Sequence, residues 1–508
     1  MTITRRTLIA GTAVVLAAPH IARPAFAAVS GRALPIPPLA DTSGGVTTLD
    51  AAAGESPFLD GARTPTWGFS QPFLGPVLRF RRGETAHMRV TNRLRWPITS
   101  HWHGLHVPAI VDGGPMLEIA PGDTWDAELQ VDQPAATLWY HSHSHGVTAE
   151  QVYLGLAGMI IVDDDTADAA SLPSDYGVDD LPLAIQDRAF ASDASFSYIK
   201  AGPALMHGFR ADHVMVNGAI RPLADVPAGI VRLRLLNASN ARIYHLRFAD
   251  GRTFHHTASD GGLLPAPVAV DRLTLAPAER VEVLVDFSGG EAVTLLSGPD
   301  VNDPMGGIGG MMGGMLPGAP PQADDGDPGE FEVMRFRPDP ARVARVTAIP
   351  ERFASAPPVR AAETDIRRDF MLDMHVGNMG GGGMGGGMMG GGMMGGRAMG
   401  MMGINGQAYD PARVDVPMRR GVPEIWRVRA MEMAHPFHVH GTQFQVLTMN
   451  GEPVPFARTG LKDVVLVEGE AELLLQVDHD ATAEVPFMYH CHILEHEDAG
   501  MMGQFTVV

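Results

Sequence analysis

Apolar and polar residues alternate along the chain in short runs, and few stretches show the periodicity of an amphipathic helix. Residues 86–94, 231–237, 281–287 and 424–430 are clear examples. Alternation over five to eight residues is typical of half-buried β-strands, because successive side chains point to opposite faces of a sheet. Glycine and proline turns separate the runs. The pattern therefore predicts an all-β protein built from β-sandwiches or barrels.

The two ends of the chain carry related motifs. Residues 139–143 read Trp-Tyr-His-Ser-His, and residues 488–492 read Met-Tyr-His-Cys-His. Residues 101–104 read His-Trp-His-Gly, and residues 438–441 read His-Val-His-Gly. The middle of the chain keeps the strand pattern, but residues 240–245 read Asn-Ala-Arg-Ile-Tyr-His in place of a histidine pair. We infer an internal repeat whose middle copy lacks the paired histidines.

The length of 508 residues is too great for one hydrophobic core and suits about three domains. We expect them at residues 45–166, 178–340 and 366–508. Two segments rich in Gly and Met interrupt the pattern, at 302–328 in the second domain and 371–402 in the third. Glycine at this density opposes both helix and strand through its backbone entropy, so we expect loops there.

The chain is acidic, with a formal net charge of −20 and 45% hydrophobic residues. This charge argues against nucleic acid and anionic membrane as partners and is compatible with cations. No stretch beyond the N-terminus is apolar for long enough to cross a membrane. We expect a monomer that binds neither nucleic acid nor membrane once it is processed.

The N-terminus has the features of an export signal. Residues 4–9 read Thr-Arg-Arg-Thr-Leu-Ile, an apolar run covers 9–18, and residues 25–27 read Ala-Phe-Ala. This order predicts a twin-arginine signal peptide over residues 1–27 and a periplasmic mature protein. The alternative is a retained membrane anchor, which the short apolar run and the small-residue cleavage site disfavour.

Histidines occur in four pairs spaced i, i+2. On a strand, this spacing places both imidazoles on the same face. A lone histidine is more often a core or surface residue than a ligand, but four pairs in matched repeats predict a metal cluster between the two ends of the chain. The pairs are His101 and His103, His141 and His143, His438 and His440, and His490 and His492.

The single cysteine, Cys491, lies between the two histidines of the last pair. Strand alternation points its sulfur to the opposite face, which predicts a second site close to the first. His435, His496 and Met501 are its available partners, and two His, one Cys and a weak Met form a blue-copper set. The alternative is a buried thiol that acts as a small hydrophobe. Ser142 occupies the matching place in the first repeat, where we expect no blue site.

Four segments, at residues 101–104, 141–143, 435–440 and 490–496, resemble the copper signatures of multicopper oxidases in order and spacing. The resemblance implies three consecutive cupredoxin-like Greek-key domains and four copper ions, one of type 1, one of type 2 and two of type 3. It implies type 1 ligands His435, Cys491, His496 and Met501, type 2 ligands His101 and His438, and type 3 ligands His103, His141, His143, His440, His490 and His492.

The resemblance also implies that dioxygen is reduced to water, which consumes protons, and family positions suggest two carboxylates as their donors. Asp112 follows the first histidine motif, and Glu497 comes directly after His496. Their alternatives are an Asp-Gly turn for Asp112 and a solvated charge for Glu497. We assign His145 no ligand role.

Eleven methionines lie within residues 371–402. Thioethers are soft ligands that prefer Cu(I), and methionine diluted with glycine cannot form a packed core. The chain is similar to the periplasmic cuprous oxidases of bacterial copper resistance, which implies substrate Cu(I) at Asp373, Met374 and Met433. One acid of that family, shortly before the first type 1 histidine, appears here as Met431 or Glu432.

We therefore expect a cuprous oxidase that detoxifies periplasmic copper. Three alternatives stay open at this point. A laccase-like enzyme would oxidise small phenols, with the Met-rich segments only covering the site. A copper chaperone or storage protein would use those segments as its working part, although it would need no dioxygen site. The segments could also be linkers without function.

Overall fold

The computed structural model describes residues 31–165, 171–200, 202–302, 329–359, 366–375 and 402–508. The predicted signal peptide and almost all of the two Gly- and Met-rich segments lie outside these residues. Strands dominate the described chain, which confirms the all-β class. None of its helices is long and apolar enough to cross a membrane. The main helices are α1 (Ala109–Asp112), α2 (Thr148–Leu154), α4 (Pro203–His207), α6 (Phe456–Thr459) and α7 (Leu494–Asp498).

Residues 31–165, the N-terminal part, form two four-stranded sheets around one core. In β5, Ala86, Met88 and Val90 are buried and alternate with exposed residues. They share a core with Leu138 and Ile160 of the other sheet, as the alternating pattern predicts. The sheet orders are β1 (Leu39–Asp41), β4 (Val77–Arg81), β8 (Ala157–Asp163), β7 (Ala136–His141), and β3 (Thr64–Phe69), β2 (Val46–Ser56), β5 (Thr85–Asn92), β6 (Thr124–Gln130).

The described residues between 171 and 359, the middle part, form a seven-stranded and a five-stranded sheet. Leu233 and Val283 of the first sheet pack in one core with Phe248 and Phe336 of the second. The seven-stranded order is β11 (Ala219–Ile220), β10 (His213–Val216), β9 (Asp180–Arg188), β13 (Ile230–Asn237), β18 (Arg280–Asp286), β15 (Phe254–Ser259), β16 (Gly262–Val270). The five-stranded order is β12 (Leu223–Pro227), β20 (Phe331–Asp339), β19 (Val293–Gly298), β14 (Tyr244–Phe248), β17 (Leu273–Leu275).

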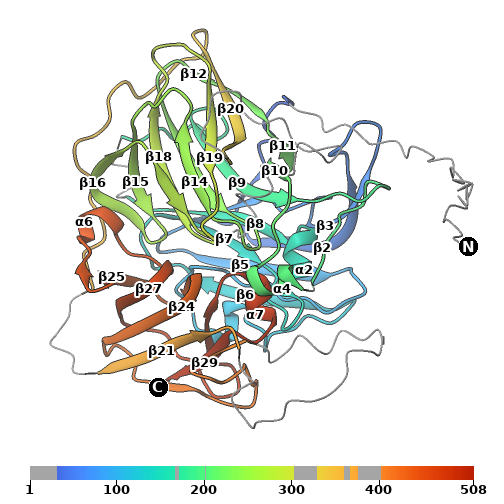
Figure 1. Cartoon of the computed structure of the whole chain (residues 1–508), viewed down its shortest axis with the longest axis vertical. Helices are drawn as coiled ribbons and strands as arrows, with labels where there is room; N and C mark the ends of the chain where they lie inside the picture. Colours follow the sequence, from blue (N-terminus) through green and yellow to red (C-terminus); the bar gives the residue numbers. More distant parts are fainter. Residues whose placement is uncertain (1–30, 166–170, 201, 303–328, 360–365, 376–401) are drawn as a thin grey trace, which may run out of the picture.

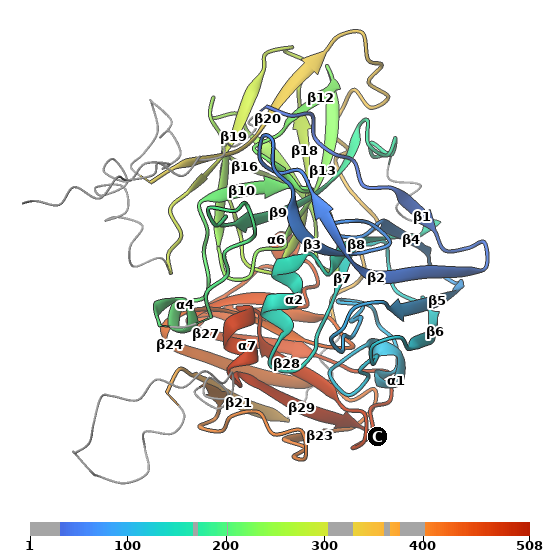
Figure 2. The same ribbon diagram turned by 90° about the vertical axis from the view of Figure 1, so that its right-hand side faces the viewer.

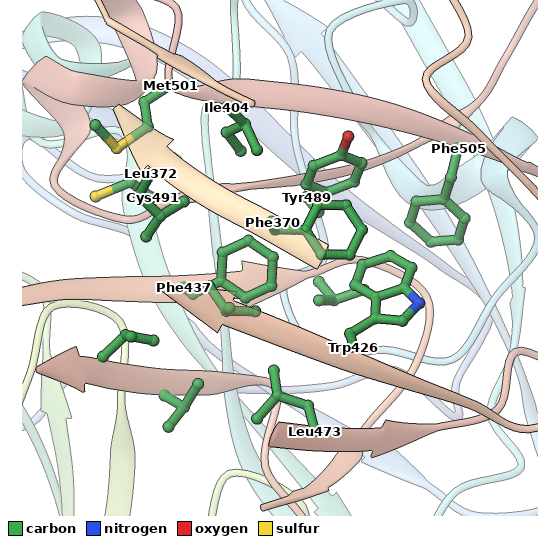
Figure 3. Packing of buried hydrophobic residues seen from close by; sticks show 14 of the residues in the cluster. Phe370, Leu372, Ile404, Trp426, Phe437, Leu473, Tyr489, Cys491, Met501 and Phe505 are labelled. Atoms are coloured by element: carbon green, nitrogen blue, oxygen red, sulfur yellow. The ribbon is translucent and has the colours of Figure 1, made fainter. Parts of the chain in front are cut away.

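The described residues from 366 to 508, the C-terminal part, form one sheet that curls around an aromatic core (Figure 3). Phe370, Trp426 and Tyr489 contact one another at its centre. The main order is β23 (Val416–Met418), β29 (Met502–Val507), β28 (Phe487–Cys491), β24 (Glu424–Val439), β27 (Val464–Leu475), β25 (Phe444–Met449), β26 (Glu452–Pro453); β21 (Arg367–Asp373) pairs with β24 and with β22 (Gly403–Ile404).

The N-terminal and C-terminal parts lie beside each other at one end of the molecule, and the middle part lies at the other end (Figures 1 and 2). A contact between α2 and α7 joins the N-terminal and C-terminal parts. In this contact the backbone N–H of Thr148 donates to Asp498 Oδ1 at 2.9 Å. This arrangement places the two sets of paired histidines against each other. The exact limits proposed for the three domains stay a prediction.

Candidate metal centres

The four histidine pairs converge where the N-terminal and C-terminal parts meet, and all eight imidazoles are buried. The two repeats use the same strand pairing, since His101 bridges to His141 and His438 pairs with His490. Rings from opposite ends of the chain then stack: the His103 and His438 centroids lie 3.7 Å apart. Spacing alone placed each pair on one face, and the packing of the two parts brings the pairs together.

Ring nitrogens in this cluster lie close enough to share metal ions. Three groups have one ligand atom per residue within 4.8 Å of each other. Buried ring nitrogens that lack a hydrogen-bond partner are rare in proteins, yet Nε2 of His101, His438 and His492 has none. These orphan nitrogens fit a set of metal ligands. The groups are His101, His103 and His141; His101, His438 and His440; and His143, His440 and His490.

Burial favours the neutral form of several cluster imidazoles. Desolvation lowers the pKa of His143 to about 3, and it holds the pKa of His438 and His440 well below the usual range. Neighbouring imidazoles add to the effect, because a second positive charge is unfavourable there. A metal binds the neutral form, so the cluster is in the state that a cation requires.

Asp112 orients two of these imidazoles. Its backbone oxygen lies 3.0 Å from His101 Nδ1, and its Oδ2 lies 2.8 Å from His440 Nδ1. Both Nδ1–H groups donate, which directs the Nε2 atoms into the cluster. Gly113 makes the approach possible at φ +83°, because a Cβ there would lie 1.9 Å from the Ser100 oxygen. Asp112 therefore contacts the cluster, as the sequence predicted.

Asp463 is a site residue that the sequence analysis missed. Its backbone oxygen accepts from His438 Nδ1 at 2.7 Å, and its Oδ1 accepts from His103 Nε2 at 3.3 Å. Asp463 thus orients one histidine of each part, His438 and His103, as Asp112 orients His101 and His440. The internal repeat would predict an acid in the C-terminal part that corresponds to Asp112. The spacing hides it, because Asp463 lies 25 residues after His438 whereas Asp112 lies only 11 residues after His101.

Glu497, on α7, lies beside two other histidines of the cluster. Its Oε1 is 3.4 Å from His143 Nδ1, and its Oε2 is 3.2 Å from His490 Nδ1. The side chain is buried, not solvated. Desolvation and the nearby Asp498 raise the pKa of Glu497 well above its usual range. Burial therefore favours the protonated form of this carboxyl beside the cluster.

Cys491 belongs to a second group of buried ligand atoms. Its Sγ is 3.3 Å from His435 Nδ1 and 3.7 Å from His496 Nδ1. The two Nδ1 atoms lie 3.3 Å apart. The Met501 sulfur points to the same side of the core as the Cys491 sulfur (Figure 3). Burial raises the pKa of the Cys491 thiol, so ionisation requires a bound cation. The counterpart Ser142 donates to Gln151 instead.

A pocket of about 390 Å³ lies beside this second group. His496 connects the two, because its Nε2–H donates to the Met206 backbone oxygen at 3.1 Å. The sequence pointed to Met374 and Met433 here but missed Met206 and His207, which come from α4, far away in the chain. The lining residues are Met206, His207, Val301, Asn302, Met374, His375, Glu432 and Met433.

Asp373, the third predicted substrate ligand, is not among the residues that line this pocket. Asp373 ends β21, and its Oδ2 accepts at 2.6 Å from the backbone N–H of Gly406, which follows β22. Met431, one of the two residues that replace the family's acid, is 75% exposed. Glu432 lines the pocket, and its Oε2 lies 3.9 Å from His375 Nε2. The carboxylate nearest to the pocket is therefore Glu432.

Comparisons with known proteins agree with this geometry. Two profiles, both described as multicopper oxidase, match the chain, one at residues 50–167 and the other at residues 385–508. A solved structure described as a laccase-like multi-copper oxidase, CueO from an Ochrobactrum species, is 39% identical, with 94% of this chain and 100% of that chain covered and a TM-score of 0.80. A multicopper oxidase from Campylobacter jejuni, described as a metallo-oxidase, is 27% identical, covers 94% and 96%, and has a TM-score of 0.76.

Curated relatives bear a different name. The cell division protein FtsP of Edwardsiella tarda is 35% identical over 100% of this chain and 99% of its own length. FtsP of Escherichia coli is 34% identical with the same coverage. The structural relatives confirm an all-β, multidomain cupredoxin fold. Together with the matched profiles and the full-length relatives, they show that the chain belongs to the multicopper oxidase family.

Proposed function

We propose that this protein is an oxidase that takes electrons singly from its substrate and passes four of them to dioxygen, so that O₂, four protons and four electrons give two water molecules. Complete and buried donor sets at both centres carry the proposal. Bound copper would supply the one-electron and dioxygen chemistry. The chain holds the protons, orients the ligands and excludes water.

The donor sets fit four copper ions. The cysteine group suits one blue copper, and eight imidazoles suit a cluster of three ions. We propose type 1 ligands His435, Cys491, His496 and Met501; type 2 ligands His101 and His438; and type 3 ligands His103, His141, His143, His440, His490 and His492.

Cys491 joins the two centres through the backbone. Its sulfur faces His435 and His496, while His490 and His492 on either side face the cluster. An electron that enters at the sulfur therefore reaches a cluster ligand through a few covalent bonds. This short route follows from strand alternation, because neighbouring residues point to opposite faces.

Protons reach the cluster from two sides in this proposal. Burial raises the pKa of Glu497, which favours its protonated form, and the carboxyl lies against His143 and His490. Asp112 lies against His101 and His440. Each carboxyl can release a proton towards reduced oxygen and be reloaded, which general acid catalysis requires.

Cu(I) is the substrate that the pocket beside His496 favours. Three thioethers line it, from Met206, Met374 and Met433. Thioethers are neutral, soft ligands that bind Cu(I) in preference to hard cations. The pocket reaches a type 1 ligand through one hydrogen bond, from His496 to the Met206 carbonyl. Oxidation there would remove toxic Cu(I).

Oxygen uptake by the copper-loaded protein tests this proposal. We expect fast uptake with Cu(I) as the donor and slow uptake with a methoxyphenol. The phenol alternative is supported by the Ochrobactrum relative, whose description gives activity towards lignin model compounds. Uptake with the phenol alone would establish the laccase alternative. Copper bound without any uptake would favour a chaperone or store.

Kinship with proteins named for cell division suggests a second candidate, because FtsP relatives match the whole chain at about a third identity. A division role would rest on a protein partner and not on turnover. It would be preferred if the intact protein carried no copper and consumed no oxygen. The buried, neutral histidines favour the oxidase.

We further propose a periplasmic location, reached by the twin-arginine route through residues 1–27, and a monomeric state. Replacement of both Arg5 and Arg6 by Lys is expected to leave the precursor in the cytoplasm. Fractionation that finds the variant in the periplasm would exclude this route.

A further inference from the structure

The described residues of the middle part supply no histidine to the buried cluster, yet one of their side chains reaches a carboxylate that faces it. Arg280 begins β18 and is fully buried. Its Nη1 donates to Asp463 Oδ1 at 2.6 Å, and its Nη2 donates to Asp463 Oδ2. The guanidinium therefore grips, with two parallel bonds, the carboxylate that faces His103. Such paired bonds fix orientation as well as charge.

All five N–H groups of Arg280 have acceptors. Besides the two carboxylate oxygens, Nε donates to the Thr137 oxygen at 3.0 Å, Nη1 to the Ala278 oxygen at 3.1 Å and Nη2 to the Asp260 oxygen at 3.3 Å. An arginine carries five donors in a fixed fork, so this position uses its full capacity. Lysine cannot reproduce the fork.

Three parts of the chain meet at this point. Thr137 and Gly104 belong to the N-terminal part, Arg280 to the middle part and Asp463 to the C-terminal part. Contact at Gly104 is close, since a Cβ there would lie 2.7 Å from Asp463 Oδ2 and 2.8 Å from Arg280 Nη2. Gly104 directly follows His103. The Arg280–Asp463 pair therefore packs against the residue that directly follows a histidine of the cluster.

Further buried charges hold Asp463 from its backbone side. Asp260 Oδ2 accepts the backbone N–H groups of Asp463 and Val464 at 3.4 and 3.3 Å. Lys462 Nζ lies 2.9 Å from the same Asp260 oxygen and 3.1 Å from Glu279 Oε1. Among the described residues, this group of buried charges therefore contains three acids, Asp260, Glu279 and Asp463, and two bases, Arg280 and Lys462. Removing Arg280 would leave three buried acids against one base, a costly arrangement.

We propose that Arg280 is a positioning residue through which the middle part, which supplies no histidine to the cluster, controls copper retention there. It holds Asp463 so that the carboxylate directs His103 and the backbone oxygen directs His438. The type 2 position depends on it most, because only two imidazoles, His101 and His438, serve it. This inference rests on the copper content proposed above, but not on the identity of the substrate.

Chelator titration of the copper-loaded protein tests the proposal. The variants are Arg280→Met and Arg280→Lys, and the type 2 copper is followed by its electron paramagnetic resonance signal. Partners of metal ligands typically change affinity by about 10- to 100-fold. We expect a loss of this size for Arg280→Met, a smaller loss for Arg280→Lys, and an unchanged type 1 absorption band in both.

Arg247→Met is the matched control, because Arg247 also pairs with a carboxylate in the middle part, with Nε 2.6 Å from Glu330 Oε1. It should keep the wild-type type 2 signal. Asp463→Asn provides a second test if Arg280→Met does not fold. It removes the carboxylate but keeps the backbone acceptor of His438, and we expect the same order of loss.

Two results would overturn the inference. One is a type 2 signal that resists the chelator in Arg280→Met or Asp463→Asn as it does in the wild type. The other is a parallel loss of type 1 and type 2 copper in every variant, including Arg280→Lys, which would show a general role in folding. Failure of the proposed function gives a different result. A wild-type protein that shows both copper signals but consumes no oxygen would contradict the proposed function, while copper retention in the variants could still be compared.

Discussion

At the scale of single residues, Asp112 and Asp463 each orient two histidines of the cluster. Each uses one backbone atom and one side-chain carboxylate. Each uses its backbone oxygen for a histidine of its own part and its carboxylate for a histidine of the other part. The pattern follows the internal repeat. Each acid therefore also joins the two parts. In the function proposed above, Asp112 has two roles, because it orients two histidines and also supplies protons.

Replacing Asp112 by Asn should separate these two roles. The backbone oxygen that accepts from His101 remains, and the amide oxygen can still accept from His440, but the group no longer releases a proton. We expect dioxygen reduction to slow by about 100-fold, the usual lower range for a lost acid-base group, while anaerobic reduction of the blue band by substrate is unchanged. Stopped-flow spectroscopy measures both steps.

Asp126→Asn is the control, because Asp126 lies on the exposed side of β6 and pairs only with Arg89 among the described contacts. It should leave both steps unaffected. If Asp112→Asn slows only the reduction of the blue band, Asp112 acts on electron entry and the proton role is wrong.

Replacing Met206 by Leu tests the substrate pocket. Leucine keeps the size and the backbone carbonyl that accepts from His496, but it removes the thioether. We expect the apparent KM for Cu(I) to rise about tenfold, with kcat, phenol oxidation and the blue band unchanged, because uniform binding affects KM alone. Met215→Leu, a buried substitution in the middle part, is the control. Equal KM values in the two variants would remove Met206 from the Cu(I) site.

Strand β24 is the element that links both centres. It spans Glu424–Val439, and its pairing with β27 is interrupted between Ala430 and His435. The bulge frees residues 431–434 from the ladder and brings Met433 to the pocket. Asn302 of the middle part holds this bulge, because its side chain donates to the Ala434 oxygen at 2.6 Å and accepts the Ala434 N–H at 3.0 Å.

Asn302→Ala should loosen this element. The substitution leaves a buried backbone N–H and oxygen at Ala434 without partners, which costs about 1–3 kcal/mol for each unsatisfied group. We expect a lower free energy of unfolding in urea and a broader blue absorption band, because His435 follows the bulge directly. Wild-type stability together with a wild-type band would show that the bulge needs no external support.

At the scale of the whole molecule, burial of many neutral histidines makes stability depend on pH. Burial lowers the pKa of His435 and His106 to about 4 and that of His143 to about 3. The unfolded chain, with pKa values near 6.5, then binds more protons than the folded chain at pH 4–6.5. Stability therefore falls as the pH falls through this window, by about 1.4 kcal/mol per pH unit for each such histidine.

We expect the copper-free protein to lose stability steeply between pH 6.5 and pH 4 and to take up several protons on unfolding at pH 5.5. Calorimetry in buffers of different ionisation enthalpy measures that uptake. Copper loading should raise the melting temperature, because the metal binds the folded chain in preference to the unfolded chain. A melting temperature of the copper-free protein that stays flat over this window would contradict the burial argument.

The sequence determined much of this protein by local rules. Spacing of i, i+2 on strands places two imidazoles on one face, and the cysteine between such a pair must point to the other face. Alternation indicated the all-β class, and the structure confirms the strands at residues 86–94, 231–237 and 281–287 within one residue or two. The run at 424–430 is the first part of β24, which continues to Val439. These features need only neighbouring residues, so they are readable from the chain.

Only the tertiary structure decided which distant groups support the site. Asp463 reaches His103 across 360 residues, Arg280 reaches Asp463 across 183, and Met206 reaches His496 across 290. No periodicity connects such positions, because their contact depends on how three separately folded parts dock. The same reason explains why Asp373, well placed by motif, ends β21 outside the pocket lining, whereas Met206 of α4, without any motif, lines the pocket.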